Sequence, residues 1–305
     1  MSPRRKNLFL VVHSPELNGD TFAQVAGDVE RIAPHIRVRV IRDSRAREKR
    51  WGRIFRPALT VSMVPLERLR PLRGPVCAGV RMSKLEELAR LAKADLPVPR
   101  WVLLEPDREP DLSGFGPYVV VKPTNGGRGA EVRIQRRGRV RYKPVTDDRG
   151  PRTAQEFIYT GRWPVSYRVT SLFGEVLFSL RSEASHDRVP LEGRELVGQA
   201  GGISIVATAR TSTYTLNYDE EVLALGRRVA MAFPDIPLLG IDIVRDHDTG
   251  RLYVLETNPS GWVWNFSSEA GRGIQQDNGI DIDGQFGGLS IAAQTLARET
   301  DRRAR

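Results

Sequence analysis

Apolar and polar positions alternate in short blocks along the first 80 residues. The apolar run 8–12 predicts a strand, the amphipathic segment that begins near Asp20 predicts a helix, and the alternating run 36–41 predicts a second strand. Two more apolar runs, 58–64 and 74–80, have turn-forming residues nearby and predict further strands. Strands that alternate with a helix are typical of an open sheet, so we expect a small α/β unit here.

One amphipathic helix follows this unit. Ser83 can cap the helix, and the helical pattern runs through Ala94. The apolar face of this helix would be formed by Leu85, Leu88, Ala89, Leu91 and Ala92. Pro97 and Pro99 then end the helix and force the chain into an extended conformation over 101–104.

Strand patterns dominate the chain from residue 118 onward. The runs that predict strands are 118–123, 130–135, 139–145, 153–159, 167–173, 175–182, 202–208, 239–246 and 251–258. The turn "DHDTG" joins the last two runs and suits a hairpin. Helices are expected from about Asp219 and over 288–303, so the whole pattern predicts an α+β fold.

Composition narrows the class of protein. Hydrophobic residues make up 40% of the chain and charged residues 28%, which is typical of a soluble globular protein. No apolar run approaches the roughly 18–20 residues that a membrane span needs, and the short run near the N-terminus reads as a strand rather than a signal peptide. The single cysteine, Cys77, excludes an internal disulfide and a cysteine-rich zinc site, so we expect a cytoplasmic protein.

The net charge of +10 predicts attraction to anions such as nucleotides, acidic metabolites or nucleic acid. No zinc-finger or RNA-binding signature accompanies the charge. A solvated basic face is therefore the favoured interpretation, and nucleic acid is not the expected partner, although a nucleic-acid-binding protein stays an alternative.

The final predicted hairpin carries three oxygen-bearing side chains. Glu256 and Asn258 are two residues apart on a strand, so both side chains point to the same face. Asp242 lies on the preceding strand and comes near them if the hairpin pairs in register. An isolated buried Asp would be costly, and an all-oxygen site suits Mg²⁺. Ordinary polar contacts within the hairpin are the alternative.

A glycine-rich turn follows Lys122, which ends an apolar strand. Gly126, Gly127 and Gly129 would let backbone N–H groups approach phosphates, and the lysine would supply a fixed positive charge. The turn links two strands and is not a Walker A loop, which opens a helix. An ordinary glycine-rich hairpin is the alternative.

Three charged residues interrupt other predicted strands. Glu156 lies between apolar residues of one strand, and Arg168 and Arg181 occupy the next two. An arginine inside a strand is unfavourable unless its side chain faces a polar cleft, where phosphate or carboxylate groups would pair with it. Surface exposure of either arginine is the alternative.

Taken in order, these motifs resemble those of the ATP-grasp superfamily, and most closely its branch of glutathione-synthetase and RimK-like carboxylate–amine ligases. The resemblance covers about residue 81 to the C-terminus, and the first 80 residues resemble the domain that usually precedes this fold. It implies an α/β domain over 1–80, followed by two α+β subdomains that clamp ATP. The subdomain over 81–160 would carry the glycine-rich lid loop, and the subdomain over 161–305 would carry the metal and substrate site.

The resemblance also implies roles for individual residues. The nucleotide-binding positions would be Lys84 and Lys122 at the phosphates, Gly126, Gly127 and Gly129 in the lid, and Gln155, Glu156, Phe157 and Ile158 in the hinge that receives adenine. The magnesium ligands would be Asp242, Glu256 and Asn258. Arg181 would steady the transferred phosphoryl group, and Arg168 would support the same anionic site. The cofactors would be ATP and Mg²⁺, with two ions expected and Mn²⁺ as a substitute.

The activity implied is an ATP-dependent carboxylate–amine ligase that forms an amide or peptide bond through an acyl-phosphate and releases ADP and phosphate. Its partners would be small-molecule or peptide carboxylates and amines, and self-association is compatible with the resemblance. An ATP-grasp phosphotransferase, a thiol ligase and a non-catalytic nucleotide-binding regulatory protein are the alternatives.

Several positions depart from the family pattern. Ser166 stands where the branch often carries an acid, and the segment 198–203 lacks the usual Asn and Arg. The aromatic segment after the metal motif places Trp262, Trp264 or Asn265 near the expected acceptor pocket, with core packing as the alternative for at least one tryptophan.

Two histidines have side chains that could take part in acid–base chemistry. His186 could act as the general base for the incoming amine, although a solvated loop position is the favoured interpretation. His13 follows the first predicted strand and could face the cleft between domains.

Overall fold

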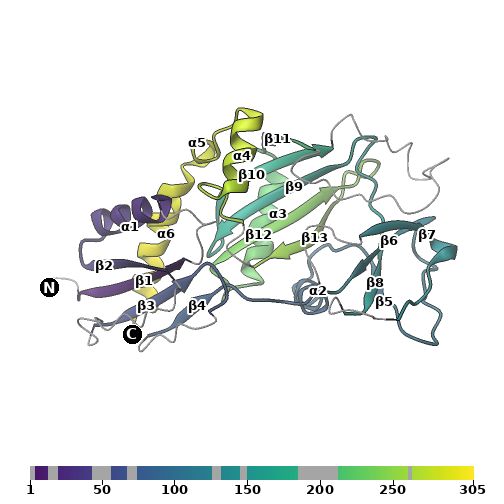
Figure 1. The fold of residues 1–305 in the computed structure, drawn as a ribbon, viewed down its shortest axis with the longest axis horizontal. Helices are drawn as coiled ribbons and strands as arrows, with labels where there is room; N and C mark the ends of the chain where they lie inside the picture. The colour runs from purple at the N-terminus through teal and green to yellow at the C-terminus, as the bar shows by residue number, and fades with distance from the viewer. Residues whose placement is uncertain are drawn as a thin grey trace.

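The computed structural model describes residues 4–12, 20–42, 56–66, 74–125, 132–144, 150–184, 212–259 and 263–305. In these ranges the chain forms three sheets and six α-helices. Figure 1 shows the third sheet between the other two, with both chain termini beside the first sheet. This mixed architecture confirms the predicted α+β fold with a small α/β unit in front of it.

The first sheet is parallel and has the strand order β2-β1-β3-β4. Its strands are β1 (Lys6–Val12), β2 (Ile36–Arg42), β3 (Ala58–Ser62) and β4 (Val76–Ala78). The helix α1 (Asp20–Ile32) connects β1 to β2, as expected for an open α/β sheet.

The second sheet is antiparallel and has the strand order β5-β8-β6-β7. Its strands are β5 (Trp101–Leu103), β6 (Tyr118–Pro123), β7 (Arg133–Arg136) and β8 (Arg152–Glu156). The helix α2 (Lys84–Lys93) precedes it and lies between this sheet and β13 (Figure 1).

The third sheet is antiparallel, with the order β11-β10-β9-β12-β13. Its strands are β9 (Val165–Leu172), β10 (Glu175–Ala184), β11 (Ser212–Leu216), β12 (Leu238–Arg245) and β13 (Leu252–Asn258). The helix α3 (Glu220–Met231) packs on one face, where a Cβ added to Gly226 would lie 2.7 Å from a methyl carbon of Val169. Only glycine permits this close approach of helix and strand.

Three helices complete the described chain: α4 (Glu269–Asn278), α5 (Ile282–Phe286) and α6 (Gly288–Arg303). Figure 1 shows α6 beside α1 on the first sheet, and the two helices contact one another. The buried side chains of the first sheet, α6 and part of the third sheet therefore form one continuous core.

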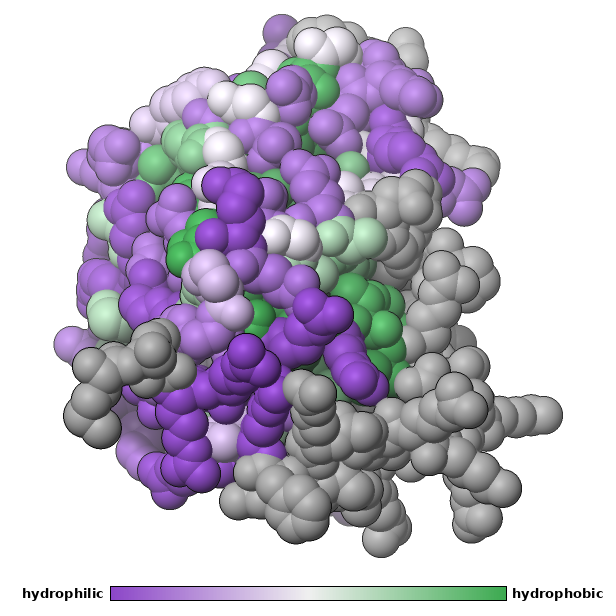
Figure 2. Space-filling model, turned by 90° about the vertical axis from the view of Figure 1, so that its left-hand side faces the viewer, coloured by the Kyte–Doolittle hydropathy of each residue, from purple (hydrophilic) through white to green (hydrophobic). Residues whose placement is uncertain are grey.

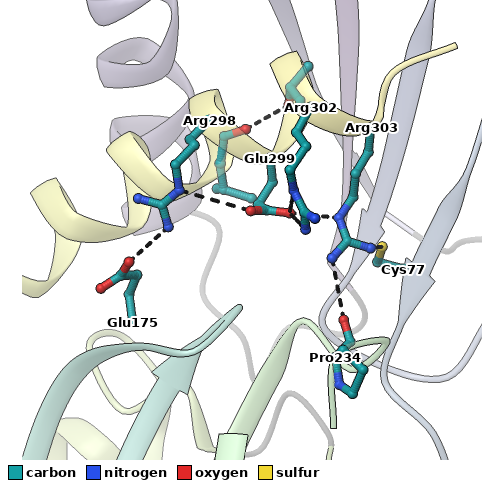
Figure 3. A network of polar contacts seen from close by, with 9 residues as sticks. Cys77, Glu175, Pro234, Arg298, Glu299, Arg302 and Arg303 are labelled. Atoms are coloured by element: carbon teal, nitrogen blue, oxygen red, sulfur yellow. Dashed lines mark hydrogen bonds and ion pairs between the residues drawn. The ribbon is translucent and has the colours of Figure 1, made fainter. Parts of the chain in front are cut away.

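The last turns of α6 tie the first sheet to the third (Figure 3). The buried carboxylate of Glu299 accepts hydrogen bonds from Arg302 at 2.5 Å and from Arg303 at 2.6 Å. Arg303 also donates to the Cys77 sulfur at 3.5 Å and to the Pro234 carbonyl at 3.4 Å. Burial raises the pKa of the Cys77 thiol, and Cys77 lies in β4, within the run over 74–80 that predicted a strand.

Figure 2 shows the end of the molecule that carries α1 and β2, where hydrophilic side chains predominate and hydrophobic ones form small areas between them. Arg37 and Arg39 are exposed on β2, which is an edge strand of the first sheet. Charged side chains on an edge strand hinder pairing with another chain, which fits the predicted solvated basic surface. None of the described helices combines the length and the apolar character of a membrane span.

The strand predicted over 139–145 is wrong in the described part of that range. Arg137–Arg139 forms a short 3-10 helix, and the Val140 N–H donates to the Arg137 carbonyl at 3.2 Å. This turn directs the chain away from β7, so residues 140–144 join no sheet. The strand predicted over 202–208 lies outside the described residues, and β11, α4 and α5 were not predicted.

Candidate nucleotide and metal site

The hairpin of β12 and β13 brings the three predicted metal ligands together. Asp242 lies directly opposite Glu256, and Gly240 lies opposite Asn258. The Asn258 amide donates to a carboxylate oxygen of Asp242 at 3.1 Å. The predicted juxtaposition of these side chains is therefore confirmed.

Arg168 reaches the same carboxylate from the neighbouring strand β9, where it lies opposite Asp242. Its guanidinium donates two parallel hydrogen bonds to Asp242, one from Nε and one from Nη2, both at 2.7 Å. This two-point geometry is the strong form of an arginine–carboxylate pair. The charge of Asp242 raises the pKa of Arg168 further above its ordinary value.

The start of α2 places Lys84 beside Glu256. Ser83 caps the helix and forms a reciprocal capping box with Glu86, which fixes Lys84 as the first helical residue. The Lys84 backbone N–H donates to the Thr124 carbonyl at 3.0 Å, and its ammonium group forms an ion pair with Glu256.

Glu256 stays ionised in this surrounding. Burial alone would raise the pKa of its carboxyl group, but Lys84, Lys122 and Arg168 together lower it to about 2. Lys122 projects from β6 and is only 6% exposed. Burial and the nearby charge of Lys84 lower the pKa of Lys122 to about 8. Three cations from three different elements therefore surround the hairpin carboxylates.

The predicted adenine hinge lies at the end of β8. Gln155 is 2% exposed, and its side-chain nitrogen has no hydrogen-bond partner among the described residues. Glu156 forms an ion pair with Arg100 at 2.8 Å, while Phe157 and Ile158 are buried. Adenine binding here stays a prediction.

Arg181 does not join the charge cluster. It lies on β10 opposite Tyr167, whereas Arg168 lies opposite Leu180. Side chains alternate along a strand, so Arg168 and Arg181 point to opposite faces of the sheet. The Arg181 guanidinium instead forms an ion pair with Glu183, and the role predicted for Arg181 stays a prediction.

The remaining predicted positions are either outside the described residues or buried. Those outside the described residues are Gly126, Gly127, Gly129, His13, His186 and Trp262. Trp264 is fully buried, stacks on Phe22 with ring centroids 4.7 Å apart, and donates from its indole nitrogen to Thr21 at 3.1 Å. Core packing, the alternative for a tryptophan, is thus confirmed for Trp264. Asn265 is also buried.

One site residue, Glu87, was missed. It is 4% exposed on α2, and its carboxylate accepts a hydrogen bond from the backbone N–H of Thr257, between Glu256 and Asn258. Burial raises the pKa of Glu87 to about 7. The buried face of α2 contains Lys84, Glu87, Leu88 and Leu91, whereas Ala89 and Ala92, which we assigned to it, are exposed. The helical spacing of Lys84 and Glu87 was the available signal.

The residue after the metal motif touches the first sheet. The Val80 N–H, just beyond β4, donates to the Pro259 carbonyl at 3.0 Å. A Cβ added to Gly79 would lie 2.8 Å from the same oxygen, so glycine allows this contact. The first sheet therefore adjoins the candidate site.

The donor set fits magnesium. Asp242, Glu256 and Asn258 offer two carboxylates and one carboxamide oxygen, which are hard ligands of the kind that Mg²⁺ prefers. In the described part of the chain, no group of three or more His, Cys, Asp or Glu side chains is placed to hold a metal ion. The side-chain oxygen of Asn258 would therefore be the third protein ligand. Magnesium ordinarily takes its remaining ligands from water and phosphate.

No protein-family model and no curated protein matches this chain. Solved structures do match it. The ATP-grasp ligase PsnB, complexed with minimal precursor, Mg and ADP, is 18% identical and superposes with a TM-score of 0.57, over 98% of this chain and 99% of that chain. The chain has the ATP-grasp fold. The D-cycloserine synthetase DcsG is 16% identical, with a TM-score of 0.53, over 96% and 99% of the two chains.

A third structure shares the ATP-grasp fold at greater distance. The D-alanine–D-alanine ligase of Bacillus anthracis, complexed with ATP, is 10% identical, with a TM-score of 0.50, over 97% of this chain and 99% of that chain. At these identities the likeness concerns the arrangement of the backbone. The chemistry of the site must be argued from its own side chains.

Proposed function

We propose that this protein is an ATP-dependent carboxylate–amine ligase that forms an amide or peptide bond and releases ADP and phosphate. The observation that carries the proposal is the cluster in which Lys84, Lys122 and Arg168 surround the carboxylates of Asp242 and Glu256. Partly buried cations and carboxylates gathered at this density are typical of a functional site.

The side chains divide into two sets by charge. Asp242, Glu256 and Asn258 would hold Mg²⁺, which would supply positive charge to offset the negative charge of the nucleotide phosphates. Lys84 and Lys122 would bind the nucleotide phosphates, and both already lie within the electrostatic reach of Glu256. The backbone groups of the hinge over 155–158 would receive adenine.

The reaction needs charge stabilisation more than a protein nucleophile. A substrate carboxylate oxygen attacks the γ-phosphorus of ATP, the bond to ADP breaks, and an acyl-phosphate forms. An amine then attacks the acyl carbon, phosphate leaves, and the amine gives up a proton. Arg168 would stabilise the negative charge that develops in these steps, as fixed cations do in phosphoryl and acyl transfer.

The solved ligases with the same fold support this choice among nucleotide-dependent reactions. One relative is a D-alanine–D-alanine ligase complexed with ATP, and another is a ligase complexed with a precursor, Mg and ADP. The substrates of our protein would accordingly be a small-molecule or peptide carboxylate and an amine.

The test is ADP release in the presence of Mg²⁺ against a panel of carboxylate and amine pairs. We expect stimulation only when both partners are present, together with one amide product per ADP. Stimulation by an alcohol acceptor alone would assign a phosphotransferase, and stimulation by a thiol acceptor would assign a thiol ligase. ATP binding without turnover on any pair would favour a regulatory protein.

A further inference from the structure

Glu87 is a buried carboxylate that the proposed reaction does not use. It lies one helical turn after Lys84 on α2, and its carboxylate accepts the backbone N–H of Thr257. We propose that Glu87 is a positioning residue that holds the backbone between the magnesium ligands Glu256 and Asn258. This inference rests on the proposed function.

The first support is the place of β13 in the sheet. β13 is an edge strand, because it pairs with β12 on one side only in the described sheet. Edge strands present backbone groups that need partners when they are buried. The chain from α2 onward provides two: Glu87 accepts the Thr257 N–H, and the Pro97 carbonyl accepts the Val254 N–H at 2.7 Å.

The second support is that α2 contacts the metal motif at two points. Lys84 contacts the Glu256 side chain, while Glu87 contacts the backbone of the next residue. Both residues share the buried face of the helix with Leu88 and Leu91. This packing fixes the position of the helix. A shift of the Glu87 carboxylate or of the Lys84 ammonium group would therefore shift the magnesium ligands on β13.

The third support is the charge around Glu87. Its carboxylate faces the cations Lys84 and Lys122 and the like charge of Glu256. A carboxylate buried beside another carboxylate is retained only where its hydrogen bonds and ion pairs offset the cost. The hydrogen bond from the Thr257 N–H does so, and it joins Glu87 to the C-terminal end of β13.

The chemistry of the side chain defines the test variants. In Glu87→Gln the amide oxygen can still accept the Thr257 N–H. In Glu87→Met the shape is similar, but no strong acceptor remains. In Glu87→Asp the charge remains, but the chain is one methylene shorter. Glu109→Met is the matched control, because Glu109 is exposed and lies outside the candidate site.

Two readouts separate positioning from general stability. Hydrogen exchange measures the protection of the Thr257 amide, and electron paramagnetic resonance measures Mn²⁺ binding in the presence of ADP. We expect Glu87→Met and Glu87→Asp to lose the protection and to weaken Mn²⁺ binding about 10–100-fold, as is usual when a partner of a metal ligand is removed. Glu87→Gln and Glu109→Met should keep both properties.

The inference is overturned if the Thr257 amide stays protected and Mn²⁺ affinity stays unchanged in the Met and Asp variants. It is also overturned if Glu109→Met causes equal losses. Should Glu87→Met not fold, the Asp and Gln pair decides the question. A wild-type protein that binds no Mn²⁺ with ADP would contradict the proposed function, and amide exchange alone would then decide whether Glu87 holds Thr257.

Discussion

Arg168 and Arg181 occupy neighbouring strands, but only Arg168 contacts the candidate magnesium ligands. Replacing Arg168 by Met should lower kcat about 10²–10³-fold, the usual effect of losing a group that stabilises developing negative charge. Replacing Arg181 by Met should leave kcat near that of the wild type, since this side chain faces the other side of the sheet. Steady-state ADP release by the two variants makes the comparison. A large loss in Arg181→Met would restore the role that the resemblance implies.

We expect the affinity for ATP to depend on pH through Lys122. Burial and Lys84 lower the pKa of Lys122 to about 8, so its ammonium group is charged below that pH and neutral above it. We expect the Kd for ATP to rise as pH increases from 8 to 9.5, by up to about tenfold per pH unit. Isothermal titration calorimetry across this range measures the change.

The control for this prediction is Lys122→Met. The variant should bind ATP weakly at pH 7 and show no increase in Kd above pH 8. A wild-type Kd that is constant from pH 7 to 9.5 would show that Lys122 does not contact the phosphates.

At the residue scale, the sequence was informative where contacts follow from a single hairpin. Asp242 and Glu256 could be paired because a short turn fixes the register of two adjacent strands. Glu87 could not be placed, because its partner is a backbone N–H 170 residues away. Arg181 was assigned to the same site as Arg168 by the family resemblance, and sequence order does not say which face of the sheet each side chain takes.

At the scale of elements, Glu299 holds Arg302 and Arg303 at the C-terminal end of α6, and Arg303 in turn contacts Cys77 of the first sheet and the Pro234 carbonyl (Figure 3). Glu299→Gln removes the charge that Arg302 and Arg303 share. We expect the free energy of unfolding to fall by about 2 kcal/mol at pH 7, as for other hydrogen bonds to charged groups. Urea denaturation followed by circular dichroism measures this difference.

The pH dependence has a definite sign. Burial would raise the pKa of Glu299, but the hydrogen bonds from Arg302 and Arg303 outweigh burial and lower it below its ordinary value of 4.5. The stabilisation is therefore complete above pH 4.5 and is lost as pH falls through the lowered pKa. The difference in free energy of unfolding between wild type and Glu299→Gln should become smaller at acidic pH. Glu109→Gln, at an exposed position, should show no difference from wild type at any pH. A difference between wild type and Glu299→Gln that does not change with pH would contradict the account.

Elements with strong local signals were predicted well. The capping box at Ser83 and the glycine-bounded helix α6 start where expected, because local hydrogen bonds fix helix ends. β11 and α5 are only five residues long, α4 contains few apolar residues, and contacts with distant segments stabilise these elements. The Gln285 side chain, for example, bridges the backbones of Ser179 and Asn217.

At the scale of the whole molecule, the first sheet shares its core with α6 and part of the third sheet. Leu8 on β1 and Leu296 on α6 are fully buried in one cluster with Phe178 of the third sheet. We therefore expect one cooperative unfolding transition, with coincident curves from tryptophan fluorescence and circular dichroism in urea.

Leu8→Ala should lower the free energy of unfolding by about 2–5 kcal/mol, and the fluorescence and circular dichroism curves should shift together. Ile32→Ala, at a position 43% exposed, should leave the midpoint nearly unchanged. Two separated transitions would show that the predicted domain over 1–80 unfolds on its own. The boundaries at 80 and 160 stay predictions, because sequence patterns reveal segments but not which cores they share.

The most direct measurement of the central claim is Mg²⁺-dependent ADP formation by Glu256→Gln, beside the control Glu220→Gln at an exposed position of α3. The positive charges of Lys84, Lys122 and Arg168 lower the pKa of the Glu256 carboxyl group. We predict that Glu256→Gln folds but loses ADP formation, and that Glu220→Gln keeps it. Full turnover in folded Glu256→Gln would contradict the magnesium–ATP site.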